Sequence, residues 1–369
     1  MRALLVLALV ALSNAADIVD PKDCVSFPCL IFNDEFDFLD MDVWEHELTM
    51  GGGGNWEFEM YVNNRSISYT RDSSLFIRPD LVANWKGEEF LTTGHMDMWG
   101  AAGRGDVCTG NAYWGCDRVG TGSNPINPIM SARLRTEGAF STKYGRIEVR
   151  ARMPKGEWLW PAVWTLPENW PYGTWPASGE IDIIESRGNA DYGDIGHQHA
   201  GSTLHWGPHW PHNRYDLTTK QYVANDGSFA ESFHVWRVDW TDEKMEFYVD
   251  DVLEMTVDPG SSFWDFGGFG DLNVDNPWVG ETEKMAPFNQ KMYLILNVAV
   301  GGTNGFFPDD VPSNPPKPWS NESPTAFLDF WNGRGSWLPS WQNGEDRISE
   351  SAAMQVDYIK VWKMYNQEM

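Results

Sequence analysis

One short segment of the chain brings together three acidic residues, Glu180, Asp182 and Glu185. The alternation Glu-Ile-Asp-Ile at its start is that of a β-strand, in which Glu180 and Asp182 share one face. Strict alternation would place Glu185 on the opposite face. One extra residue, a β-bulge near Ile183 and Ile184, would return Glu185 to the acidic face. The alternative interpretation is an acidic strand face that is solvated and has no chemical role.

Carboxyl groups paired in this way are suited to acid–base and nucleophilic catalysis. A bulged strand would separate the outer Cα atoms by about 13 Å, at ~3.3 Å per residue. Side chains that lean toward each other would leave their carboxyl groups about 5–6 Å apart, near the spacing of glycosidases that retain anomeric configuration. Asp182, between them, would orient the nucleophile by hydrogen bonding and raise the pKa of the acid partner.

Strand patterns dominate the rest of the chain. Polar and apolar residues alternate in four segments, 74–78, 146–153, 233–240 and 245–250, as in half-buried strands. Two further segments, 292–300 and 354–362, are more continuously apolar and predict strands buried on both faces. No long segment shows helical periodicity, so we predict an all-β fold with two antiparallel sheets packed as a sandwich. The Pro-, Trp- and Asn-rich stretch 301–346 predicts a long ordered loop beside the site.

The chain begins with one basic residue and an apolar run that ends at small residues. This pattern predicts a secretory signal peptide over residues 1–15, followed by a single domain over 16–369. The alternative, a membrane anchor, would need about 20 apolar residues. We therefore expect a secreted, extracellular protein, in which Asn64 and Asn321 each begin an Asn-X-Ser glycosylation site.

Four cysteines fall into two close pairs, Cys24 with Cys29 and Cys108 with Cys116. Four cysteines allow three connectivities, and in an exported chain the two local disulfides are favoured. A metal site is the alternative, but the sequence contains no C-x-x-C spacing.

The formal net charge of −26 disfavours nucleic acid, anionic membranes and polyanionic polysaccharides as partners. A neutral polymer suits this charge best. The 21 tryptophans favour a carbohydrate ligand weakly, because many of them must lie in the core.

The acidic segment resembles the E-I-D-I-I-E signature of glycoside hydrolase family 16, in the branch of the laminarinases (endo-1,3-β-glucanases). Invertebrate members and the related β-glucan recognition proteins are especially similar. The resemblance extends from about Cys24 to Trp362. It includes the segments 51–58, 131–136, 143–150, 160–164, 202–208 and 296–304.

This resemblance implies a β-jelly-roll sandwich with a substrate groove on its concave face. It implies that Glu180 is the nucleophile, Glu185 the general acid/base and Asp182 the assisting carboxylate, in agreement with the spacing argument. The hydrolysis that the resemblance implies needs no organic cofactor. Some members bind a structural calcium on the outer face, and Asp357 matches one position of that site.

Trp160 and Trp164 match tryptophans that contact sugar in the family. They are four residues apart on a strand and share a face; core packing is the alternative for each. Asn55, Arg133 and His205 match positions that face the cleft in relatives.

Histidines cluster near His205, and a zinc site is one interpretation of this cluster. It would need a defined ligand set and second shell, so a sugar-contacting His205 among ordinary loop histidines is the preferred interpretation. The cluster comprises His197, His199, His205, His209 and His212.

The sequence thus predicts a monomeric, retaining endo-β-glucanase. It would cut internal β-1,3 bonds of laminarin, and of mixed 1,3/1,4-glucan, by double displacement through a glycosyl-enzyme intermediate. Transglycosylation would use the same residues. The alternative is a non-catalytic β-glucan recognition protein of innate defence; such relatives typically lack one or more of the acids, whereas all three are present here.

Overall fold

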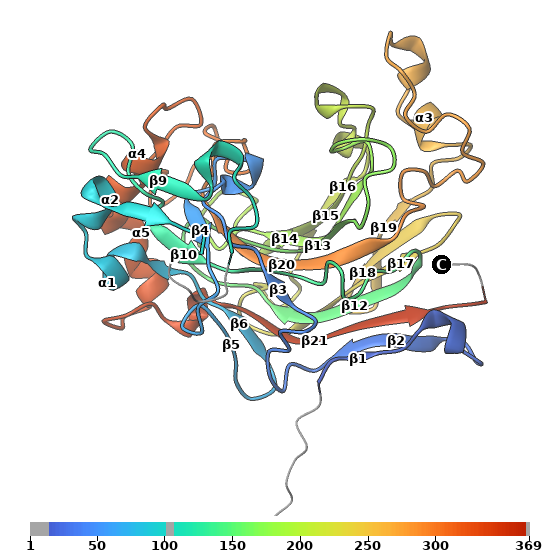
Figure 1. Cartoon of the computed structure of the whole chain (residues 1–369), viewed down its shortest axis with the longest axis horizontal. Helices are drawn as coiled ribbons and strands as arrows, with labels where there is room; N and C mark the ends of the chain where they lie inside the picture. Colours follow the sequence, from blue (N-terminus) through green and yellow to red (C-terminus); the bar gives the residue numbers. More distant parts are fainter. Residues whose placement is uncertain (1–14, 101–106, 367–369) are drawn as a thin grey trace, which may run out of the picture.

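Two large β-sheets are stacked face to face in the computed structural model, which describes residues 15–100 and 107–366 (Figure 1). All strand pairs within these two sheets are antiparallel. The predicted all-β sandwich is therefore confirmed. The inner sheet carries the acidic segment and follows the order β16 (Thr219–Val223), β15 (His199–His205), β14 (Glu180–Ser186), β13 (Leu159–Pro167), β20 (Met292–Val300), β11 (Arg133–Arg135) and β3 (Glu45–His46).

The outer sheet packs behind the inner one. Its order is β1 (Asp17–Ile18), β2 (Cys29–Asp34), β21 (Met354–Lys363), β12 (Gly145–Arg152), β17 (His234–Trp240), β18 (Met245–Val249) and β19 (Val252–Val257), and β6 (Leu75–Ile77) joins β21 to β5 (Ser68–Thr70). Smaller sheets comprise β4 (Glu59–Tyr61), β10 (Ile129–Ser131) and β7 (Asp80–Leu81), and β8 (His95–Asp97) with β9 (Asp117–Val119).

Short helices lie in the connections between strands. The α-helices are α1 (Val82–Lys86), α2 (Phe90–Thr93), α3 (Phe263–Phe266), α4 (Ala326–Asn332) and α5 (Arg334–Gln342). Single 3-10 turns are η1 (Pro21–Asp23), η2 (Gly52–Gly54), η3 (Ala112–Trp114), η4 (Trp210–His212), η5 (Tyr215–Leu217), η6 (Phe269–Asp271) and η7 (Glu350–Ala352). Tall connections stand on both sides of the inner sheet and leave its middle strands between them (Figure 1).

Alternation in the sequence corresponds to burial in the strands. Every second residue of β12 is buried, and β17 and β18 follow the same pattern. All nine residues of β20 are buried, as its continuous apolar run predicts. Strand β21 differs, because only its first half is buried on both faces and its second half alternates.

The stretch 301–346 is only partly a loop, and this corrects the prediction. It contains α4 and α5, which pack through aromatic side chains rather than through a periodic apolar stripe. Phe330 stacks on Trp337 with ring centroids 4.5 Å apart, and the indole of Trp341 donates to the carbonyl of Glu157 at 2.8 Å. Pro339 lies inside α5. Proline and a missing apolar stripe both hide a helix from periodicity.

Both predicted local disulfides are present, Cys24–Cys29 and Cys108–Cys116. Among the described residues, no helix is long and apolar enough to cross a membrane. Residues 1–14 of the predicted signal peptide lie outside the described residues. Asn64 and Asn321 are half-buried, and their glycosylation stays a prediction.

Candidate active site

Strand β14 contains the bulge that the spacing of its acids predicts. Against β15, Asp182 is opposite Thr203 and Glu185 is opposite Gly201, so three steps on β14 match two on its neighbour. The same offset occurs against β13. Ile181, Ile183 and Ile184 are buried in the core, while Glu180 and Glu185 are half-buried. The bulge thus separates the core side chains from the outer acids.

Each outer acid accepts a hydrogen bond from an indole. Nε1 of Trp175 donates to Oε2 of Glu180 at 2.5 Å. Nε1 of Trp160 donates to Oε1 of Glu185 at 2.8 Å. An indole N–H can only donate, so each contact orients a carboxyl group and leaves its other oxygen available. No sequence pattern pointed to Trp175, although it lies only five residues before Glu180.

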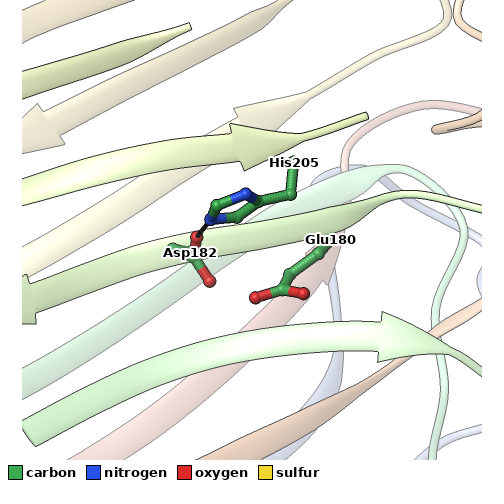
Figure 2. Close-up of side chains that lie close together, drawn as sticks. All are labelled: Glu180, Asp182 and His205. Atoms are coloured by element: carbon green, nitrogen blue, oxygen red, sulfur yellow. Dashed lines mark ion pairs between the residues drawn. The ribbon is translucent and has the colours of Figure 1, made fainter. Parts of the chain in front are cut away.

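Asp182 lies between the outer acids and contacts His205 of β15. Oδ2 of Asp182 and Nε2 of His205 are 3.2 Å apart, and Figure 2 shows this pair beside Glu180. The other imidazole nitrogen, Nδ1, is 2.8 Å from Nδ2 of Asn213. The Oδ1 atom of Asn213 accepts from the backbone N–H of Trp206 at 3.2 Å. The imidazole is therefore fixed from both sides, and Asn213 is a positioning residue that the sequence did not indicate.

Burial controls the titration of this site. Burial raises the pKa of Glu185, and the charge of Glu180 adds to the effect, while the Trp160 hydrogen bond opposes it. Burial and the charges of Glu180 and Glu185 raise the pKa of Asp182 well above its usual range. Burial lowers the pKa of His205, but Asp182 and the other carboxylates outweigh it and raise that pKa to about 9. The imidazole of His205 therefore carries its second proton near neutral pH, which places a positive charge against the carboxyl group of Asp182.

The ring face of Trp160 is covered. Its indole is 8% exposed and stacks on Phe306 with centroids 3.8 Å apart and an interplanar angle of 7°. Arg187 also contacts Phe306. Its guanidinium carbon lies 3.9 Å from the Phe306 ring centroid, and its Nε donates to the Phe306 carbonyl at 2.8 Å. Trp160 thus offers its N–H to Glu185 rather than an open face to a sugar. Phe306 and Arg187 were missed, because no local pattern links them to Trp160.

Trp164, predicted to contact sugar, and Arg133, predicted to face the cleft, contact each other. The guanidinium carbon of Arg133 lies 4.5 Å from the Trp164 ring centroid. Its Nε is 3.1 Å from the carboxylate of Glu47. Nε1 of Trp164 donates to Oδ1 of Asn297 at 2.7 Å. One face of Trp164 is therefore occupied by a cation–π contact.

A chain of hydrogen bonds continues from Asn297 to Asn55. Nδ2 of Asn297 is 3.2 Å from the Tyr61 hydroxyl, and this hydroxyl donates to Oε2 of Glu57 at 3.1 Å. Nδ2 of Asn55 donates to Oε1 of Glu57 at 2.8 Å. The structure thus connects Asn55 through buried polar groups with Trp164, which is opposite Asp182 on the neighbouring strand.

Two groups of donor side chains bear on metal binding. Among the described residues, Glu180, Asp182 and His205 form the one group of three or more acidic, His or Cys side chains whose ligand atoms lie within 4.8 Å of one another. Asp357 of β21 forms an ion pair with Arg150 of β12. This guanidinium places a positive charge at the carboxylate, which does not fit a calcium ion there.

The chain is similar in sequence and in fold to proteins of one family. Residues 120–266 match the model of the family described as glycosyl hydrolases family 16. A beta-1,3-glucan-binding protein of Penaeus monodon is 70% identical over 354 residues, covering 96% of this chain and 95% of that protein. A glucan endo-1,3-beta-glucosidase of Cryptopygus antarcticus is 31% identical over 276 residues, and the match covers 74% of this chain and 80% of that protein.

Among solved structures, the laminarinase from Rhodothermus marinus superposes with a TM-score of 0.56 at 23% identity. The match covers 91% of this chain and 98% of that one. The sandwich is thus the jelly roll expected from the sequence, and the chain belongs to glycosyl hydrolase family 16.

Proposed function

We propose that this protein is a secreted, retaining endo-β-glucanase that cuts internal β-1,3 bonds of a neutral glucan such as laminarin. The observation that carries the proposal is the bulge in β14. It presents Glu180 and Glu185 on one side of the inner sheet, each oriented by an indole N–H. Mixed 1,3/1,4-glucan is a second proposed substrate.

In the proposed mechanism, Glu180 attacks the anomeric carbon while Glu185 gives its proton to the departing glycosidic oxygen. A glycosyl-enzyme ester on Glu180 results. Glu185, now ionised, takes a proton from a water molecule, whose oxygen attacks the anomeric carbon; the bond from that carbon to Glu180 breaks, and the Glu180 carboxylate is restored. The raised pKa of Glu185 suits the first step, because it keeps this carboxyl protonated at higher pH.

The test is hydrolysis of laminarin by the purified protein, with product anomers followed by NMR. Reducing ends that appear first as the β-anomer support a retaining enzyme, and first appearance of the α-anomer contradicts it. Lack of any cleavage of laminarin or barley-type mixed-linkage glucan rejects hydrolysis.

A second candidate function is glucan binding without hydrolysis. It is favoured by the 70% identical relative from Penaeus monodon, which is named for binding β-1,3-glucan. Binding of laminarin with no cleavage under any tested condition would select this function.

Asp182→Asn is expected to lower the hydrolysis rate by about tenfold, because Asp182 acts through orientation and charge rather than by bonding to substrate. The variant also removes the negative partner of His205, so the pKa of that imidazole falls below 9. Rate measurements and NMR titration of the histidines test both effects. An unchanged His205 titration would show that Asp182 does not control the imidazole.

Trp160→Phe is expected to move the alkaline limb of the pH–rate profile to higher pH. The indole N–H stabilises the ionised form of Glu185, so its loss raises the pKa of the carboxyl. A general acid must be protonated, and activity is lost as the pH rises through its pKa. The measurement is kcat/KM against pH. A limb that stays in place or moves to lower pH contradicts the assignment of Glu185 as the acid.

A further inference from the structure

Three aromatic side chains are exposed together on two neighbouring turns. Trp56 is 48% exposed, Tyr113 47% and Trp114 74%. The rings of Trp56 and Tyr113 are in contact, with centroids 4.9 Å apart, and Trp114 follows Tyr113 within η3. Single exposed aromatics are common on protein surfaces, but a contiguous group marks a binding surface more often.

All three residues have a left-handed backbone. Their φ angles are 55° for Trp56, 54° for Tyr113 and 60° for Trp114. Bulky residues rarely adopt this region, because Cβ crowds the backbone, and the conformation persists only where the surroundings enforce it. The chain thus holds three large rings in strained positions that leave them facing solvent.

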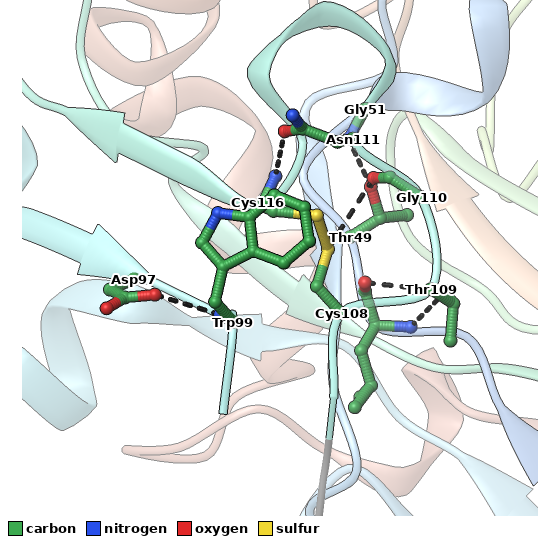
Figure 3. Close-up of a disulfide and its surroundings, with 10 residues drawn as sticks. Thr49, Gly51, Asp97, Trp99, Cys108, Thr109, Gly110, Asn111 and Cys116 are labelled. Carbon is green, nitrogen blue, oxygen red and sulfur yellow. Dashed lines mark hydrogen bonds between the residues drawn. A yellow bond between two sulfur atoms is a disulfide. The ribbon is translucent and has the colours of Figure 1, made fainter. Parts of the chain in front are cut away.

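The turn that carries Tyr113 and Trp114 is fixed by the Cys108–Cys116 disulfide and by hydrogen bonds to the segment 48–51 (Figure 3). The Thr49 hydroxyl donates to the Gly110 carbonyl at 2.6 Å, and the Met50 N–H donates to the Gly115 carbonyl at 2.7 Å. Gly115 permits this approach, because a Cβ there would lie 2.3 Å from the Thr49 hydroxyl oxygen.

The Arg118 guanidinium also holds this turn, through hydrogen bonds to two backbone carbonyls. It donates to the carbonyl of Tyr113 at 2.8 Å and to that of Met50 at 3.1 Å. The backbone that carries Tyr113 and Trp114 is therefore held in place before any ligand binds, and preorganised aromatic groups lose less conformational entropy on binding.

The turn that carries Trp56 is hydrogen-bonded to a loop that reaches the candidate active site. Asn55, which precedes Trp56, donates to Glu57 and accepts from the N–H of Thr303 at 2.9 Å. Thr303 belongs to the loop that carries Phe306, which covers Trp160 next to Glu185. This loop therefore links the turn of Trp56 to the surroundings of Glu185.

We propose that Trp56, Tyr113 and Trp114 form an accessory platform that binds a neutral glucan chain beyond the catalytic groove, a proposal that rests on the proposed glucan substrate. Indole and phenol rings present flat apolar faces with one polar group each, as suits the C–H faces and hydroxyls of uncharged sugar rings. The net charge of −26 disfavours an anionic polymer here.

The test compares laminarin with laminaritriose, which is short enough to remain at the acids. Dissociation constants are measured by calorimetry in the Glu180→Gln background, so that neither ligand is cut. Trp56→Ala with Trp114→Ala is expected to weaken laminarin binding by about tenfold, as loss of roughly 60 Å² of buried apolar surface would. Laminaritriose binding is expected to stay unchanged.

Trp85→Ala is the matched control, because Trp85 is 50% exposed but lies on α1. It should change neither constant. Trp114→Ala alone removes the most exposed ring and serves if the double variant unfolds, and Trp114→Phe should restore most of the lost affinity. Thermal melting of each variant checks the fold.

Unchanged laminarin binding in the variants overturns the platform, and so does an equal loss for both ligands. A change in oligomeric state on sedimentation, with unchanged binding, would assign the surface to a second copy of the chain and also overturns it. If the wild type cuts laminarin while the variants bind it normally, the platform fails and the proposed function stands. If the parent protein binds no laminarin, both fail.

Discussion

Glu180→Gln is expected to reduce laminarin hydrolysis by at least about a thousandfold while leaving laminarin binding intact. The amide cannot attack the anomeric carbon, so the glycosyl-enzyme no longer forms. The amide oxygen can still accept the hydrogen bond from Trp175 at the same place, so the local structure should survive. Glu185→Gln is expected to lose activity comparably, because the leaving oxygen is no longer protonated.

The measurement is kcat on laminarin, with Kd by calorimetry and melting temperature as controls. Glu57→Gln provides a comparison, because Glu57 is a hydrogen-bonded carboxylate that belongs to the Asn55 network, with Asn55 and Tyr61 rather than any of the three acids as its donors. Wild-type rates in either Glu180→Gln or Glu185→Gln would refute the paired-carboxylate mechanism. A glucan-binding protein without activity would show no difference between wild type and variant.

The second large effect is expected on the free energy of unfolding, for a substitution of Glu59 on β4. This side chain is fully buried; Oε2 accepts from the N–H of Val300 at 2.7 Å, whereas Oε1 has no donor among the described residues. Burial, with the neighbouring charge and hydrogen bond of Glu57, raises the pKa of Glu59 well above its usual range. When Glu59 is protonated, its O–H can donate a hydrogen bond to Glu57, and this bond supplies the partner that Oε1 lacks.

A raised folded-state pKa means that the native protein holds a proton that the unfolded chain releases above about pH 4.5. The contribution of Glu59 to the free energy of unfolding is therefore largest at low pH, and it is lost as the pH rises toward the folded-state pKa. Glu59→Gln removes the titration, because its amide N–H₂ donates to Glu57 and its carbonyl accepts from Val300 at every pH.

We expect Glu59→Gln to gain about 2 kcal/mol of unfolding free energy at alkaline pH, the usual cost of an unsatisfied buried polar group. No gain is expected near pH 4. Denaturant unfolding at pH 4, 7 and 9 measures this, with Glu350→Gln as a comparison at a partly exposed, Arg-paired carboxylate. A gain that does not depend on pH would contradict the shared proton.

Local sequence patterns predicted the features that depend on neighbours in the chain. Alternation identified strands such as β12, and the spacing of Glu180, Asp182 and Glu185 required the bulge in β14. The disulfides followed from short separations, because closing a small loop costs little chain entropy.

Features that depend on distant partners were not predictable in this way. The stacking of Phe306 on Trp160 joins residues 146 positions apart, and nothing near Trp160 in sequence marks its face as covered. Asn213 reaches His205 through a loop whose conformation is set by the Trp206 backbone. Helix α5 is held by tryptophan contacts rather than by its own periodicity.

The bulge in β14 has an evolutionary consequence. Core packing constrains Ile181, Ile183 and Ile184, whereas the outer acids contribute little to it. Glu180 or Glu185 could therefore be replaced during evolution without loss of folding stability, and the side chains around them would stay in place. Receptors and hydrolases would then diverge on one scaffold by one or two codon changes, and a descendant that lost turnover would still be selected for recognition.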